Sequence, residues 1–224
     1  MSTPGGFDAP PPGYVSYEAA VRPGPAPALT PLRLMMIVSL LVAAVAEVGN
    51  TVVLALRSWR VGNLLDGQAA GMSLQPLLTT ARWLNWIIIA SVVVNLVGVV
   101  TWSGRLSDRA VELGNVAVKP TMARWGWVIP IGQWWLPFTE LRKVATGRGD
   151  DGRAVARWQT VYIVRSAIGL TGYAIGKLPA KLSDLHGALI VHAARHGALA
   201  VCAVLLAVAM ARGTARLGAL VGGV

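Results

Sequence analysis

The chain has 224 residues, of which 54% are hydrophobic and 13% are charged, and its formal net charge at pH 7 is +10. A soluble domain of this size carries about a quarter charged residues, so the composition favours an integral membrane protein. The basic residues flank apolar runs instead of clustering on a polar face, which argues against nucleic-acid binding. The single cysteine, Cys202, allows no internal disulfide.

The first 31 residues are rich in proline and glycine, with eight prolines and four glycines. Such a segment cannot bury enough apolar surface to offset the entropy of ordering it. The sequence therefore predicts a disordered tail over residues 1–31, followed by one membrane domain over residues 32–217.

Four apolar runs follow the tail, and each has roughly the twenty residues that a helix needs to cross a hydrocarbon core. The third and fourth runs are the weaker pair because each contains an arginine. The predicted fold class is an all-α membrane protein with four transmembrane helices. We expect these spans at residues 34–56, 83–102, 158–176 and 189–211.

The loops between the predicted spans differ in positive charge. Residues 103–157 contain nine Lys or Arg, whereas residues 57–82 contain three and residues 177–187 contain two. Cytoplasmic loops carry the excess of Lys and Arg in membrane proteins. We therefore expect both termini and the long middle connection to lie in the cytoplasm.

A Trp/Pro-rich stretch, residues 125–138, interrupts the middle connection. It holds four of the nine tryptophans and two prolines. It is too apolar for an ordinary loop, and too short and too broken by proline to form one spanning helix. We expect an interfacial segment in the headgroup layer or a re-entrant one. A plug against the helix ends and a full span remain as alternatives.

This stretch resembles the signature of a family of uncharacterised actinobacterial multi-pass membrane proteins, a domain of unknown function. The signature reads W-x-x-P-I-x-N-x-W-x-P, and Gln133 stands where the family has asparagine. The resemblance implies four spans in a bacterial plasma membrane, and it implies no activity. The matching residues are Trp127, Pro130, Ile131, Trp135 and Pro137.

Polar residues inside the predicted spans are the candidate binding residues, because ionisable groups at membrane depth are costly. Depths counted along each helix predict an outer layer and a lower layer, the latter with Arg165 and Asn95. One interpretation is a polar pathway or a small-ligand site. The favoured one is a structural ion pair between Glu47 and Arg195, with Arg165 extending to the cytoplasm. The outer layer comprises Glu47, Asn50, Arg195 and His196.

Two further patterns were considered on the third and fourth spans. His192 and His196 have the spacing of metal ligands on one helix face, but Arg195 beside them opposes a cation, so we expect no metal and no cofactor. Gly172 and Gly176 allow close helix packing, and homo-oligomerisation through them is the alternative.

The sequence favours a non-enzymatic membrane scaffold or a partner-binding subunit. Its expected partners are the lipid bilayer and a protein, and no nucleic acid. The alternative is a small transporter or channel component that uses the outer polar layer. A membrane enzyme ranks third because only the histidines would support it.

Overall fold

The computed structural model describes residues 29–67, 74–175 and 182–222, and it describes no side chains between residues 172 and 183. Residues 1–28 of the predicted tail lie outside this description, while Thr30 and Pro31 already belong to the first helix. Every element in the described ranges is helical. The elements are α2 (Thr30–Leu65), α3 (Gln75–Glu112), α4 (Pro120–Trp125), η1 (Gly132–Trp134), α5 (Leu136–Thr146), α6 (Arg153–Ile175) and α7 (Leu182–Leu220).

Three helices in the described part of the chain are long and apolar enough to cross a membrane: α2, α3 and the Asp184–Leu220 part of α7. They contain three of the four predicted apolar runs. The fourth run lies in α6, which is not among these candidates and carries Arg153, Arg157 and Arg165 in 23 residues.

The long helices extend well past their apolar centres. With 36, 38 and 39 residues, α2, α3 and α7 measure about 54 to 58 Å, whereas a hydrocarbon core is about 30 Å thick. Proline near the start of α2 and α3 supplies a preset backbone angle where an amide donor is not needed. At the other end of α3, Gly114 has a φ of +88°. There the Asn115 amide donates to the Ala110 carbonyl, which ends the helix with a Schellman motif.

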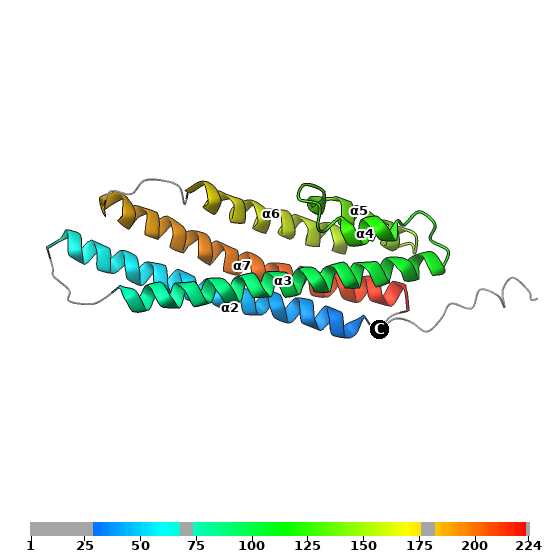
Figure 1. Cartoon of the computed structure of the whole chain (residues 1–224). Coiled ribbons are helices and arrows are strands. Elements are labelled where there is room, and N and C mark those ends of the chain that lie inside the picture. The colour runs from blue at the N-terminus through cyan, green and yellow to red at the C-terminus, as the bar shows by residue number, and fades with distance from the viewer. Residues whose placement is uncertain (1–28, 68–73, 176–181, 223–224) are drawn as a thin grey trace, which may run out of the picture.

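The long helices form an antiparallel row in which α2 packs against α3 and α7, and α7 packs against α6. Figure 1 shows α2 and α3 along one side and α6 and α7 along the other. The two outer helices of the row, α3 and α6, have no extensive packing contact with each other. The start of α2 and the end of α7 lie at the same end of the bundle (Figure 1).

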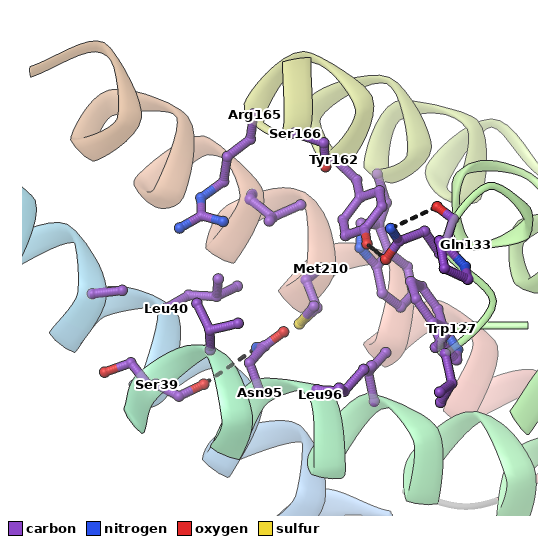
Figure 2. Close-up of a pocket in the computed structure, with 18 residues that line it drawn as sticks. Ser39, Leu40, Asn95, Leu96, Trp127, Gln133, Tyr162, Arg165, Ser166 and Met210 are labelled. Carbon is purple, nitrogen blue, oxygen red and sulfur yellow. Dashed lines mark hydrogen bonds between the residues drawn. The ribbon is translucent and has the colours of Figure 1, made fainter. Parts of the chain in front are cut away.

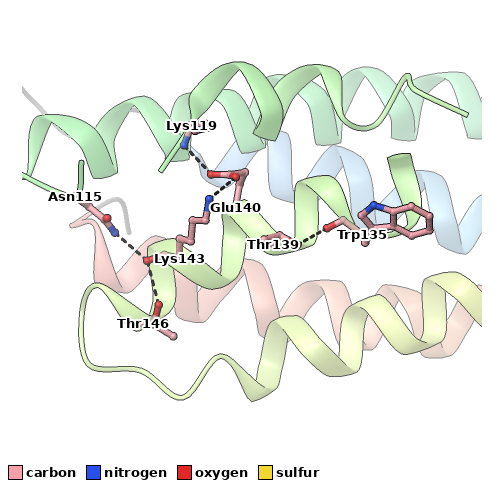
Figure 3. A network of polar contacts seen from close by, with 7 residues as sticks. All are labelled: Asn115, Lys119, Trp135, Thr139, Glu140, Lys143 and Thr146. Carbon is pink, nitrogen blue, oxygen red and sulfur yellow. Dashed lines mark hydrogen bonds and ion pairs between the residues drawn. The ribbon is translucent and has the colours of Figure 1, made fainter. Parts of the chain in front are cut away.

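At that end, residues 120–146 form the α4–α5 hairpin, which packs against α3 and α6. The Glu140 carboxylate accepts hydrogen bonds from the Lys119 amide and from the Lys143 ammonium, both at 2.7 Å. The Asn115 side-chain amide donates to the Lys143 carbonyl at 2.9 Å (Figure 3). These bonds attach the hairpin to the segment that follows α3.

Candidate functional site between α3 and α6

The Trp/Pro stretch forms the turn of the α4–α5 hairpin, with Pro130 in a non-helical turn and Pro137 in the first turn of α5. One face of the stretch is buried, and Trp127 is only 3% exposed. Burial of this face is a feature that the plug alternative, in which the stretch packs against the helix ends, would also have. Five other apolar side chains of the stretch are exposed, and together they are named the exposed apolar ridge: Trp125, Val128, Ile129, Ile131 and Trp135.

The buried face belongs to an aromatic cluster at the end of the α3–α6 gap. The Trp127 ring stacks on Trp158 of α6 at 5.9 Å and meets Phe138 of α5 edge-on at 5.0 Å. The Trp127 indole N–H donates to the Ser103 hydroxyl at 3.1 Å. That hydroxyl in turn donates to the Ala123 carbonyl at 2.9 Å. The cluster therefore fixes the hairpin against both α3 and α6.

Beyond the cluster, the gap contains a cavity of about 370 Å³, a volume within the range of small-molecule sites. Figure 2 shows α2, α3, α6, α7 and the Trp/Pro turn around it. The mouth includes the exposed apolar side chains of Val92, Leu96 and Val128. The polar side chains on its wall are Ser39, Ser91, Asn95, Gln133, Tyr162, Arg165 and Ser166.

Most polar groups on this wall already have partners. The Tyr162 hydroxyl donates to the Gln133 side-chain oxygen at 3.0 Å, and the Gln133 amide donates to the Pro130 carbonyl at 2.9 Å. On the opposite wall, the Asn95 amide donates to the Met36 carbonyl at 3.0 Å and to the Ser39 hydroxyl at 3.2 Å. These bonds give the wall a fixed arrangement.

Arg165 differs from the other polar residues of the cavity. Its guanidinium makes no hydrogen bond or ion pair with any residue that the structure describes, and its Nε atom is buried. The side chain extends from α6 into the gap, away from Gln133 and Trp127 (Figure 2). The sequence analysis expected the side chain to extend toward the end of the bundle that carries the hairpin, which it expected in the cytoplasm, and the side chain does not point toward that end. The two residues of the lower layer proposed from the sequence, Arg165 and Asn95, line the same cavity.

The outer polar layer has a different pairing from the expected one. Glu47 is 3% exposed, and its carboxylate contacts His196 Nδ1, not Arg195. Arg195 instead donates to two carbonyls of α6, through Nη2 to Gly169 at 3.0 Å and through Nε to Ile168 at 3.3 Å. The predicted Glu47–Arg195 pair is therefore wrong, although both residues are engaged between helices.

The other polar residues of this region are also paired. The Asn50 side-chain amide donates to the Asn85 side-chain oxygen at 2.9 Å. His186 Nδ1 lies 2.9 Å from the Ser58 carbonyl oxygen. Within the described ranges, no group of three His, Cys, Asp or Glu side chains is placed to hold a metal ion.

The sequence analysis anticipated part of the cavity. Trp127, Pro130 and Gln133 of the signature line it, whereas Trp135 and Pro137 do not. The members that it missed are Ser39, Ser91, Tyr162 and Ser166. A signal for two of these was present, because Tyr162 and Ser166 are spaced four residues apart around Arg165 and share its helix face.

None of the four residues of the outer layer, Glu47, Asn50, Arg195 and His196, lines this cavity. Gly176, which the expected packing step pairs with Gly172, lies outside the described residues. Comparisons with protein-family models, with curated proteins and with solved structures find no match for the chain.

Proposed function

We propose that this chain is a non-enzymatic membrane protein that binds an amphiphilic molecule in the cavity between α3 and α6. The observation that carries the proposal is the polarity of the cavity. Its mouth is lined by exposed apolar side chains, while Asn95, Tyr162 and Arg165 stand on its wall. An opening between two membrane helices admits a chain from the bilayer, and the polar wall then contacts the polar end of the same molecule.

In this proposal α6 is the fourth span of a bacterial plasma-membrane protein. It lies antiparallel along α7 and has 23 residues, more than the roughly twenty needed to cross. Arg153 and Arg157 are at its hairpin end, and Arg165 faces the cavity. The charge of the loops favours the cytoplasm for the hairpin end and for both termini. The resemblance of the Trp/Pro signature to the actinobacterial family supports the same architecture.

The exposed apolar ridge supports a position of the hairpin at the membrane surface. Trp125 and Trp135 belong to this ridge, and tryptophan is enriched where membranes meet water. The ridge then lies in the lipid headgroup layer, next to the mouth of the cavity. The proposal therefore retains the interfacial placement that the sequence predicts for this stretch.

The sequence analysis expected a protein as the partner of a scaffold or partner-binding subunit, and the present proposal has an amphiphilic molecule as the bound partner instead. A transport path through Glu47 has less support. Its carboxylate and the Arg195 guanidinium are both engaged by other helices.

A photoreactive phospholipid with a diazirine in its acyl chain tests the proposal. Crosslinks mapped by mass spectrometry should fall on cavity residues such as Leu96, Tyr162 and Met210. Ser166→Phe fills the cavity from α6 and should remove these crosslinks. Val93→Phe is the matched control, because Val93 is exposed on α3 and does not line the cavity. Crosslinks confined to outward-facing residues, unchanged by Ser166→Phe, would overturn the proposal.

The orientation needs its own test. Single cysteines at Val116 and Asp66, in a Cys202→Ser background, report on the two ends of the bundle. Val116 is 89% exposed, so its accessibility depends on the side of the membrane and not on burial. An impermeant maleimide added to whole cells should label Asp66→Cys and spare Val116→Cys; the reverse pattern contradicts the orientation.

A further inference from the structure

The geometry points to a phosphate-bearing membrane lipid as the ligand of this cavity, with Arg165 as the residue that binds the phosphate. This inference rests on the proposed function and adds the chemical class of the ligand. It starts from the charge of the cavity. Among the residues that line the cavity, Arg165 is the only charged one.

A cation at membrane depth needs a counter-charge, because the loss of its hydration is otherwise not offset. The described part of the chain supplies none to Arg165. Glu47, the acid on the neighbouring spans, is already paired with His196. The guanidinium also does not turn toward the hairpin end of the bundle (Figure 2), so it does not reach the headgroup layer there. A counter-anion must therefore come from a bound molecule.

The hydrogen bonds of the cavity wall also favour an anionic group on the bound molecule. The donors of Tyr162, Asn95 and Gln133 are engaged by protein acceptors. The guanidinium donors of Arg165 are not, and the buried indole N–H of Trp158 also has no partner among the described residues. These two groups of donors are therefore without an acceptor in the described part of the chain. A guanidinium presents five N–H donors in a planar fork that matches the oxygens of a phosphate.

The remainder of the wall fits the apolar part of a lipid. Leu40, Val99, Leu206 and Met210 line the cavity between its polar residues. A volume of about 370 Å³ holds a small ligand, here the polar end of a lipid and the start of its chain. The rest of the chain passes through the mouth between α3 and α6, along exposed Val92 and Leu96, into the bilayer.

Native mass spectrometry of the full-length chain in detergent, titrated with defined lipids, tests this assignment. Phosphatidylglycerol is the phosphate-bearing probe, and diacylglycerol, which has the same acyl chains and no phosphate, is the comparison. Wild type should bind phosphatidylglycerol more tightly by on the order of tenfold, as one charge-assisted hydrogen bond implies. Arg165→Gln should remove this preference and leave diacylglycerol binding unchanged.

The matched control is Arg157→Gln, because Arg157 lies on the same helix, is exposed and does not line the cavity. This variant should keep the wild-type preference. Arg165→Lys, which retains the charge without the planar fork, should keep the preference with weaker binding. It also provides a reading if Arg165→Gln does not fold.

Competitors distinguish the sources of the anion. If inorganic phosphate displaces the lipid at equal concentration, the site binds free phosphate and the lipid assignment is overturned. If oleate binds more tightly than phosphatidylglycerol, the ligand is a carboxylate. Equal binding of phosphatidylglycerol and diacylglycerol by wild type overturns the role of Arg165 but leaves the cavity as a lipid site. If neither lipid binds in a way that Ser166→Phe removes, the proposed function fails as well.

Discussion

Polar side chains have protein partners at the α2–α7 interface, whereas the arginine in the α3–α6 gap has none in the described chain. Across the interface, Glu47 pairs with His196 and Ser58 contacts His186, within closely packed helices. In the gap, the helices lack extensive packing and Arg165 has no partner in the described chain. Buried polar groups are normally satisfied within the protein. The paired groups therefore explain how the bundle is held together, and the unpaired Arg165 is the basis of the proposed ligand site.

The largest effect is expected from the aromatic cluster that closes the gap. Trp127→Ala should destabilise the protein by about 3–5 kcal/mol, because it removes a fully buried ring and leaves a cavity. Trp135→Ala is the control, since Trp135 is 47% exposed, and it should cost less than about 1 kcal/mol. Chemical unfolding in detergent measures both. Equal losses would mean that the gap is a packing defect, not a cavity that the cluster holds open.

The next effect concerns the paired interface. In a double-mutant cycle, Glu47→Gln and His196→Gln should show a coupling of about 1–3 kcal/mol, because the two side chains are in contact. The cycle of Glu47→Gln with Arg195→Gln is the comparison, and its losses should be additive. Thermal unfolding in detergent provides the measurement. Strong coupling to Arg195 would restore the pair expected from the sequence and contradict the structure.

Arg165 and Arg195 should respond to the same substitution with opposite signs. In lipid-free detergent, Arg165→Met should stabilise the protein by about 1 kcal/mol, because an unpaired charge is replaced by an apolar side chain of similar length. Arg195→Met should destabilise it by a similar amount, since two carbonyls of α6 lose their donor. Melting curves of both variants give the signs. A loss for Arg165→Met would show that its guanidinium has a protein partner.

The smallest effect is expected at an ion pair in water. Arg216 and the adjacent Gly152 amide hydrogen-bond the Asp150 carboxylate, which holds its pKa below the ordinary value. A pKa that is lower in the folded protein than in the unfolded chain stabilises the fold at a pH above the unfolded-chain pKa, which is about 4 for aspartate. This stabilisation is lost as the pH falls below that pKa. When the pH is lowered from about 6 to about 3, the melting temperature of wild type should therefore drop more than the melting temperature of Asp150→Asn. Parallel curves would contradict the pair.

The helices were predictable from sequence because long apolar runs have few alternative structures. Their ends were not, since the polar turns that extend α3 toward Glu112 carry no apolar signal. The position of the Trp/Pro stretch was predictable only in part. Its exposed ridge suits an interface, whereas the burial of Trp127 depends on contacts with Ser103 and Trp158. Those contacts join segments far apart in the sequence.

The partner of Glu47 shows the limit of counting along a helix. Depth placed Glu47, Arg195 and His196 in one layer, and the structure also brings them to the same region. Depth says nothing about direction around the helix axis, and consecutive residues point about 100° apart. That angle turns His196 toward α2 and Arg195 toward α6. The same missing angle concealed that Arg165 and Asn95 face a common cavity.

The length of α3 has a mechanical consequence. Its 38 residues make a rod of about 57 Å, so a change of about 5° in tilt moves its far end by about 5 Å. The segment after α3 is tied to α5 through Glu140 and Asn115. A thinner or thicker bilayer that alters the tilt of α3 would therefore displace the α4–α5 hairpin as a unit. The position of the hairpin would in this way report the tilt of α3 in the bilayer.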